Sequence, residues 1–258
     1  MQSLLNRAAR FGARILWDKM GIKICIQRRR DFKWPGEDNR FDYQERYVEF
    51  NIKAGERVLD IGNGGDPFPC ATILADKFLE NKILRGEPLV THNKPFVLAD
   101  IQELPFSDKS FGFIYCSHLL EEVDDPLRAC AELMRIGKRG FIETPTMGKD
   151  ALFAWAKGIQ KWHVVAIGQN LCFFEYSQRQ LLGIDSTAWR DIVLSKTRHP
   201  LQKAFYENLD LFNVLFEWED CFSVFLFRLD GTVRTWNSEV ESLPRLTASQ
   251  NDRKPQDL

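Results

Sequence analysis

From residue 55 onward, short apolar runs alternate with polar or glycine-rich segments. Runs of this length with no polar side are typical of parallel strands that are buried on both faces of a sheet. We therefore expect strands at the following positions: residues 57–61, 72–75, 96–99, 111–116 and 141–143.

One helix is predicted between the last two of these strands. Asp124 or Asp125 can cap its start, Pro126 suits the first helical position, and Gly137 can end it. Apolar residues follow at helical spacing, at Leu127, Cys130, Ala131 and Met134. A strand, a helix and a second strand in succession form a right-handed crossover unit, so the pattern predicts an α/β fold with a parallel sheet.

The pattern also divides the chain into five segments. Residues 147–210 are rich in aromatics without strand alternation, so we expect a helical cap inserted before the sheet is complete. Two apolar runs, 212–218 and 222–227, precede an Asp230-Gly231 turn signal and predict a hairpin that completes the sheet. The expected units are an N-terminal helix and linker, a ligand-binding core, the cap, the hairpin and a disordered tail: 1–50, 51–146, 147–210, 211–236 and 237–258.

Composition narrows the class of protein. The chain has 258 residues, of which 44% are hydrophobic and 28% charged, as expected of a folded domain rather than a disordered chain. The net charge of -1 gives the molecule no general affinity for nucleic acid. The longest uncharged run, 162–174, is too short to cross a membrane as a helix, and we expect a cytoplasmic protein. The scattered cysteines predict neither disulfides nor a structural metal.

The first 33 residues are locally basic, with nine Lys or Arg against two Asp. On a helical wheel the apolar residues gather opposite Arg7, Arg10 and Arg14. We favour a helix packed on the body with a solvated charged face. The alternative is a helix, within residues 1–22, that lies on an anionic membrane at the inner face.

The clearest chemical signal is the strand that runs from Val58 through Asp60 into Gly62, Gly64 and Gly65. Glycines at the end of a parallel strand allow a nucleoside-type ligand to approach the backbone closely. A dinucleotide motif would need a third glycine at 67, where this chain has Pro67.

Acids that follow three successive strands favour a second ligand, S-adenosylmethionine. Asp60, Asp76 and Asp100 lie at or just beyond the predicted strand ends. Asp76 can accept the ribose hydroxyls, and Asp100 can accept the amino group of adenine. Each aspartate alone is also typical of a turn or a cap, but their joint placement favours the nucleoside site.

Three stretches then resemble a known family. Residues 58–64 look like the first motif of class I S-adenosylmethionine-dependent methyltransferases, and residues 99–111 and 116–135 resemble the type 11 branch. The resemblance covers about residues 55–146. It implies a Rossmann-like doubly wound sheet of seven strands, in the order 3-2-1-4-5-7-6 with the last strand antiparallel. It also implies a set of residues that bind S-adenosylmethionine: Asp60, Gly62, Asn63, Gly64, Asp76, Asp100, Ile101 and Ser117.

This chain departs from the family pattern at three places. Asp66 stands where the first motif usually has its last glycine, and Glu122 stands where the family commonly has a histidine. Eleven residues, including Pro67 and Pro69, separate Gly64 from Asp76, which is too few for the usual helix. The link between Gly64 and Asp76 must therefore run past the ligand as a loop, without the helix that the family usually has there.

Methyl transfer from a sulfonium needs an aligned nucleophile and, for a hydroxyl acceptor, a nearby base. The candidate bases are His118, after the fourth strand, His163, in the aromatic segment, and Glu143, at the end of the fifth strand. Each histidine can equally be a hydrogen-bonded packing residue, and Glu143 can equally bind a substrate hydroxyl.

The sequence thus predicts a cytoplasmic methyltransferase that methylates oxygen on a small molecule or a surface-glycan precursor, with no metal. Several aromatics can line such a pocket or pack within the cap: Trp155, Trp162, Phe173, Phe174, Tyr176 and Trp189. The alternatives are a membrane-surface methyltransferase acting on a quinone or lipid, and a non-catalytic binding module with the same fold. Nucleic acid is not expected as a partner, because the basic residues cluster in one segment.

Overall fold

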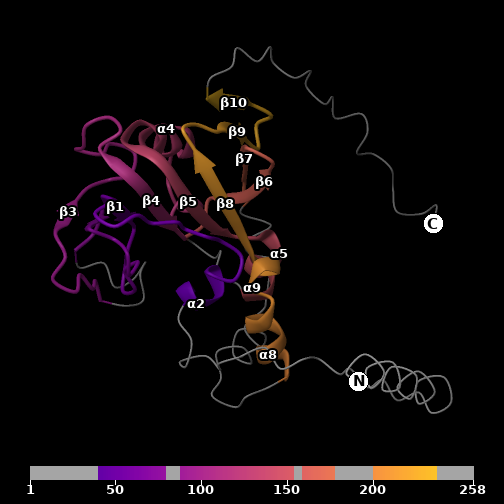
Figure 1. Cartoon of the computed structure of the whole chain (residues 1–258). Helices are drawn as coiled ribbons and strands as arrows, with labels where there is room; N and C mark the ends of the chain where they lie inside the picture. Colours follow the sequence, from indigo (N-terminus) through magenta and orange to yellow (C-terminus); the bar gives the residue numbers. More distant parts are fainter. Residues whose placement is uncertain (1–39, 80–87, 154–158, 178–199, 237–258) are drawn as a thin grey trace, which may run out of the picture. The chain divides into compact units, whose positions relative to one another are not determined.

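The computed structural model describes residues 40–79, 88–153, 159–177 and 200–236 (Figure 1). The basic segment 1–22, the tail 237–258, Trp155 and Trp189 lie outside the described residues. No helix within the described ranges combines the length and apolar character needed to cross a membrane.

The core is a six-stranded sheet in the order β3-β2-β1-β4-β5-β8. All neighbouring strands are parallel except β5 and β8, which are antiparallel. The strands are β1 Val58–Ile61, β2 Ile73–Asp76, β3 Phe96–Leu98, β4 Phe111–Ser117, β5 Gly137–Pro145 and β8 Asn213–Glu219. The five predicted parallel strands and the α/β class are therefore confirmed, and β5 extends well beyond the predicted 141–143.

The predicted crossover helix is α4, Pro126–Ile136, which connects β4 to β5. The Asp125 carboxylate accepts a hydrogen bond from the Arg128 N–H at 3.2 Å, and Pro126 lies in the first turn. Gly137 follows directly as the C-cap. The capping and spacing in the sequence thus predicted both ends of this helix.

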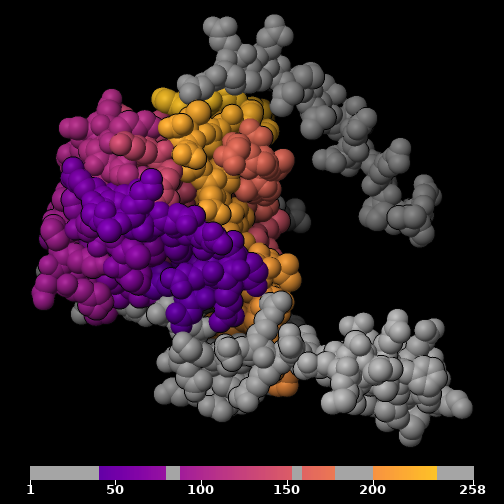
Figure 2. Space-filling model, in the orientation of Figure 1, coloured from indigo at the N-terminus to yellow at the C-terminus, as the bar shows by residue number. Residues whose placement is uncertain are grey.

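Both faces of the central strands β1, β2, β4 and β5 are mostly buried, which explains why these strands have no polar side. On β4, Phe113 and Tyr115 pack on one face with Phe50 and Phe68. The other face packs against α4 and the strands of a second sheet. Figure 2 shows the N-terminal described segment, in indigo, spread over the near side of the molecule. Burial on both faces leaves the carboxyl-terminal edge of the sheet as the place where polar strand-end residues gather.

The segment predicted as a purely helical cap contains a β-hairpin, so that prediction was wrong for residues 162–175. The hairpin consists of β6, Trp162–Ile167, and β7, Asn170–Glu175, joined by a two-residue turn. Gly168 in that turn has φ +59°, and glycine at this place favours a hairpin. Among the described residues of this segment and its end, helices are found at α5 Met147–Phe153, α8 Pro200–Glu207 and α9 Leu209–Phe212, in agreement with the helical part of the prediction.

The predicted C-terminal hairpin was also wrong in its pairing. β8 joins the main sheet, but β9, Ser223–Phe227, pairs with β7 and with β10, Val233–Trp236. The second sheet therefore has the order β10-β9-β7-β6, and the described main sheet has six strands rather than seven. β9 leaves the main sheet because its buried residues, Val224 and Leu226, pack into the core that includes α4.

The remaining described helix is α2, Arg40–Gln44, which lies near the start of the described chain. Phe41 and Tyr43 on it are buried, and Phe41 packs on Phe68 and Tyr115. This packing brings a segment distant in sequence to the carboxyl ends of the central strands.

Candidate functional site

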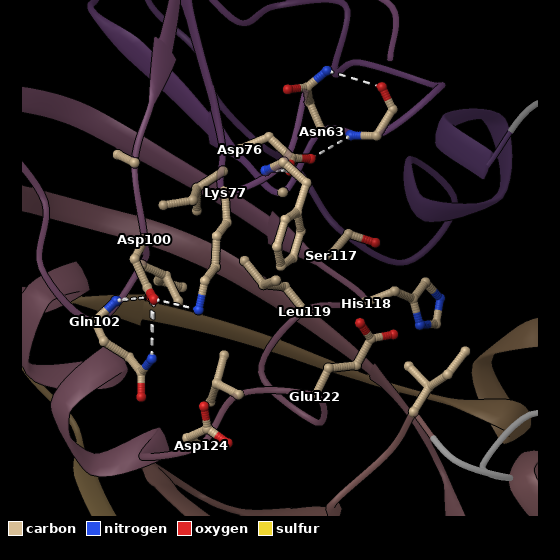
Figure 3. Close-up of a pocket in the computed structure, with 18 of the residues that line it drawn as sticks. Asn63, Asp76, Lys77, Asp100, Gln102, Ser117, His118, Leu119, Glu122 and Asp124 are labelled. Carbon is tan, nitrogen blue, oxygen red and sulfur yellow. Dashed lines mark hydrogen bonds and ion pairs between the residues drawn. The ribbon is translucent and has the colours of Figure 1, made fainter. Parts of the chain in front are cut away.

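A cavity of about 580 Å³ lies at the carboxyl ends of β1, β2, β3 and β4. The strand order reverses between β1 and β4, and open α/β sheets bind ligands at such a switch point. The volume is within the range of about 300–1,000 Å³ that is usual for small-molecule sites. Figure 3 shows the strand-end side chains converging on this cavity. Seven of the eight predicted cofactor-binding residues line it: Gly62, Asn63, Gly64, Asp76, Asp100, Ile101 and Ser117.

The eighth, Asp60, has a different position. It is 1% exposed, and it is not among the residues that line the cavity. Its carboxylate accepts a hydrogen bond from the Phe68 N–H at 2.7 Å. Asp60 therefore holds the loop after β1, and strand alternation explains its place, since it shares a face with Val58, which packs in the Phe68 cluster.

The glycine loop comes close to the cavity wall. Gly62 has φ +75° and Gly64 has φ +54°, in the left-handed region that favours glycine. A Cβ on Gly62 would lie 2.8 Å from the Leu119 Cδ2 atom, which is closer than real Cβ contacts. Residues 62–72, all of them described, form no helix. The site thus lacks the helix N-terminus that a dinucleotide pyrophosphate would use, as the short proline-containing link predicted.

Two of the predicted acids are held in place at the rim. Asp76 accepts hydrogen bonds from the Phe78 N–H at 2.9 Å and the Gly64 N–H at 3.4 Å. Asp100 pairs with the Lys77 ammonium at 2.8 Å and accepts from the Gln102 N–H. Burial alone would raise the pKa of Asp100, but Lys77 and Gln102 outweigh it and hold the pKa below its usual value.

The lining is rich in acids and contains buried oxygens without partners. Its five acids outnumber its three basic residues, Lys77, Lys161 and His118; the acids are Asp66, Asp76, Asp100, Glu122 and Asp124. Within the described part of the chain, Asn63 Oδ1 and Ser117 Oγ are buried and have no hydrogen-bond partner. Such a lining suits a ligand that carries cations and hydrogen-bond donors, and it repels phosphates.

His118 lines the cavity, and its side chain is 33% exposed. Its Nδ1 atom lies 3.3 Å from a Glu121 carboxylate oxygen, and its Nε2 atom lies 3.1 Å from Glu143. Burial and the Lys149 charge lower its pKa, but the bonds to Glu121 and Glu143 outweigh them and raise it above 6.5. The φ of +53° at His118 is rare for a residue with a side chain and is consistent with a functional constraint.

Glu143 lies at the end of β5 behind His118 and is 2% exposed. Its two carboxylate oxygens accept hydrogen bonds from the Tyr43 hydroxyl and the Gln44 side-chain amide. Burial raises its pKa, but His118, Lys149 and Tyr43 outweigh this and lower it below its usual value. Glu143 does not line the cavity, so it positions His118 rather than facing a ligand.

Lys149 completes this buried group. Its ammonium donates to Asn213 Oδ1 at 2.6 Å and lies 3.3 Å from His118 Nε2. Burial lowers the pKa of Lys149 below its usual value. We call His118, Glu121, Glu143 and Lys149 the polar cluster, and it meets the cavity through His118.

His163 is not part of this arrangement. It lies on β6, where its ring centroid is 5.8 Å from that of Phe174 and 6.2 Å from that of Tyr176. It does not line the cavity, and burial lowers its pKa. The structure therefore contradicts the prediction that His163 is a base at the site, because the segment is a strand of the second sheet rather than a helical cover.

Sequence reasoning missed several residues of this region. Tyr43 and Gln44 are about one hundred positions from Glu143, and no local pattern links them. Lys149 had no motif around it. The sequence drew attention to Glu122 only as a departure from the family pattern. Its place directly beside Glu121 could have indicated a functional acid, since neighbouring carboxyls raise each other's pKa.

Comparison with known proteins agrees with the predicted family. Residues 74–142 match a family model described as a methyltransferase domain. The chain is 30% identical over 124 residues to cycloartenol-C-24-methyltransferase 1 of Oryza sativa subsp. japonica, covering 42% of this chain and 36% of that protein. It is 33% identical over 91 residues to demethylmenaquinone methyltransferase of Renibacterium salmoninarum, covering 33% and 38% of the two chains. With the protein of the same name from Geobacillus stearothermophilus it shares 27% identity over 139 residues, covering 49% and 55%.

These matches are partial. The chain spans between 36% and 55% of the length of the curated relatives it matches. The family model covers part of the main sheet, from β2 to β5.

Proposed function

We propose that the chain, which carries a class I methyltransferase domain of the type 11 branch, transfers methyl groups from S-adenosylmethionine to a small-molecule acceptor. The observation that carries this proposal is the acid-rich cavity at the strand switch point, with Asp76, Asp100 and the glycine loop on one rim. Its charge and its lack of a helix N-terminus favour a sulfonium nucleoside over a dinucleotide.

The residues present fit this cofactor. Asp76 is placed to accept the ribose hydroxyls, and Asp100 the adenine amino group, with Lys77 sharing the same carboxylate. Gly62 and Gly64 allow the ligand to approach the backbone. Asn63 Oδ1 and Ser117 Oγ offer buried acceptors that have no partner within the described residues. When bound, S-adenosylmethionine supplies an electrophilic methyl group on a cationic sulfur.

For the acceptor we propose a hydroxyl on a small molecule or a surface-glycan precursor, in a cytoplasmic enzyme. The cavity lining supports this, because Ser117, His118 and Glu122 place polar side chains on its wall. Hydrogen bonds to such groups can orient a hydroxyl, whereas an apolar acceptor would leave them unpaired.

Calorimetry with S-adenosylhomocysteine tests the cofactor site. Asp76→Asn keeps the size of the side chain but removes its charge, and we expect at least a tenfold loss of affinity, about 1.4 kcal/mol. Glu103→Gln is the matched control, since Glu103 is exposed and outside the cavity. Micromolar binding by the wild type that is weakened only by Asp76→Asn supports the proposal, and no binding by the wild type refutes it.

A second candidate acts on a quinone or lipid at a membrane surface. It is favoured by the names of the relatives, which include a cycloartenol and a demethylmenaquinone methyltransferase, and by the basic segment 1–22. It predicts that the protein sediments with anionic phospholipid vesicles and that deletion of residues 1–22 abolishes this. Binding that survives the deletion counts against it.

A non-catalytic binding module is the remaining alternative. It keeps the fold but has lost the cofactor, so it predicts that S-adenosylhomocysteine does not bind and that no labelled methyl group reaches any acceptor. An acceptor screen with labelled S-adenosylmethionine separates the two, because one methylated product is enough to exclude the module.

A further inference from the structure

Glu122 is the acid of the cavity with the least support from neighbouring groups. It lines the cavity between Leu119 and Asp124, and Figure 3 shows its carboxyl close to His118 and Leu119 in that view. Among the described residues its side chain makes no hydrogen bond and no ion pair. Ionising a partly buried carboxyl that has no hydrogen-bond partner costs free energy, so the presence of a glutamate at this position calls for a functional reason.

The charges that face Glu122 come from several elements. Glu121 is its neighbour in the loop, His118 follows β4, Lys161 precedes β6, and Asp76 ends β2. Lys161 already pairs with the Asp124 carboxylate. The surrounding acids therefore oppose ionisation of Glu122, and the nearest cations already have acidic partners.

The polar cluster offers no spare cation either. His118 and Lys149 are balanced by Glu121 and Glu143, and Asp150 adds a further buried carboxyl that accepts from the Tyr176 hydroxyl. Ionising Glu122 would therefore add a net negative charge to a poorly solvated region. Burial and the charge of Glu121 raise the pKa of Glu122 to about 8.

His118 is poorly suited to receive a proton from an acceptor. Both of its ring nitrogens already lie within 3.3 Å of a buried carboxylate, one from Glu121 and one from Glu143. The Lys149 ammonium also lies 3.3 Å from the Nε2 atom, so both ring nitrogens are engaged by charged groups of the protein. The site therefore needs another proton acceptor, and Glu122 lines the same cavity.

We propose that Glu122 is the proton-exchanging group of this site: its carboxyl releases a proton when a cationic ligand enters the cavity, and it takes up the acceptor's proton during methyl transfer. This inference rests on the proposed function. The sulfonium cation compensates the Glu122 carboxylate, so that cofactor binding and deprotonation are coupled.

The step balances in atoms and charge. The bond between the methyl carbon and sulfur breaks with its electron pair left on sulfur, and a bond forms between that carbon and the acceptor oxygen. The hydroxyl proton passes to the Glu122 carboxylate. One cation and one anion become two neutral groups, and Glu122 returns to the protonated form that it has in the empty cavity.

Proton release on binding tests this without knowledge of the acceptor. Titrations at pH 7 in two buffers of different ionisation enthalpy give the number of protons released on binding S-adenosylmethionine and on binding S-adenosylhomocysteine. The two ligands share all groups except the sulfonium methyl. We expect S-adenosylmethionine to release about 0.9 proton more, because a carboxyl with a pKa of about 8 is mostly protonated at pH 7.

Two variants assign the proton. Glu122→Gln should abolish the difference between the two ligands while S-adenosylhomocysteine affinity stays within about threefold, about 0.7 kcal/mol. Glu103→Gln, the same change at an exposed position, should leave the difference intact. If Glu122→Gln does not fold, isotope-edited infrared spectra of the wild type carry the test, since the protonated carboxyl band should disappear when S-adenosylmethionine is added.

The outcomes separate the two proposals. If both ligands bind with equal proton release, or if the difference persists in Glu122→Gln, the role of Glu122 is refuted and the methyltransferase proposal stands. If neither ligand binds the wild type, both proposals fail.

Discussion

Replacing Glu143 with glutamine probes the polar cluster that supports the candidate site. The carboxylate is buried at the end of β5, accepts from Tyr43 and Gln44, and lies 3.1 Å from the His118 ring. Glutamine offers one acceptor oxygen where glutamate offers two, and its amide nitrogen is itself a donor. At position 143 this nitrogen would face a neighbouring donor, so Tyr43, Gln44 and His118 cannot all keep an acceptor.

The size of the effect follows from burial. Removing one partner of a buried ion pair typically costs about 3–5 kcal/mol. His118 can avoid part of this cost by losing its proton, which places the change toward the lower end of the range at high pH. For a domain of this size each kcal/mol lowers the melting temperature by about 2–4 °C, so we expect a decrease of about 6–20 °C.

The effect should depend on pH with a defined sign. Glu121 and Glu143 raise the pKa of His118 above its usual 6.5, so the stabilisation from its charge is complete below 6.5 and is lost as pH rises through the raised value. The pKa of Glu143 is lowered from 4.5, so its contribution is complete above 4.5 and is lost as pH falls through the lowered value. The difference in unfolding free energy between wild type and variant should therefore be largest between pH 4.5 and 6.5.

Urea unfolding followed by circular dichroism at pH 5.5 and at pH 9 measures this difference. Glu217→Gln on β8 is the control, because Glu217 is an exposed glutamate of the antiparallel neighbour strand and should change stability by less than about 0.5 kcal/mol. If Glu143→Gln lowers the unfolding free energy by less than about 1 kcal/mol, or by the same amount at both pH values, a charged pair between His118 and Glu143 is refuted.

Two further substitutions test the glycine loop and the helix cap. Gly62→Ala should cost about 1–2 kcal/mol for its φ of +75° and should also weaken S-adenosylhomocysteine binding in calorimetry, because the new Cβ meets Leu119. Gly55→Ala shares the positive φ but has no atom within 4 Å of the new Cβ, so equal losses of affinity in both variants would contradict this account. Asp125→Ala should lower the unfolding free energy by about 0.5–2 kcal/mol through loss of the α4 cap, as measured by urea unfolding, whereas Asp125→Asn should retain most of it. A larger loss for the asparagine than for the alanine variant would exclude capping as the cause.

Much of the core was predictable because its signals are local. Strands that are buried on both faces have no polar side, and the cap, proline and C-terminal glycine of α4 are adjacent in sequence. Parallel strands also bring their carboxyl ends to one edge, so Asp76, Asp100 and the glycine loop had to meet once the sheet was recognised.

The sequence by itself therefore determined the α/β core, its crossover helix and the rim of the cavity, since each depends on neighbouring residues or on strand periodicity. Only the tertiary structure decided which way Asp60 faces, that β9 leaves the main sheet, and that Tyr43 and Gln44 reach Glu143 from about one hundred positions away. It also raises the pKa of Glu122, because a pKa depends on burial and on charges brought together from several elements, which no local pattern encodes.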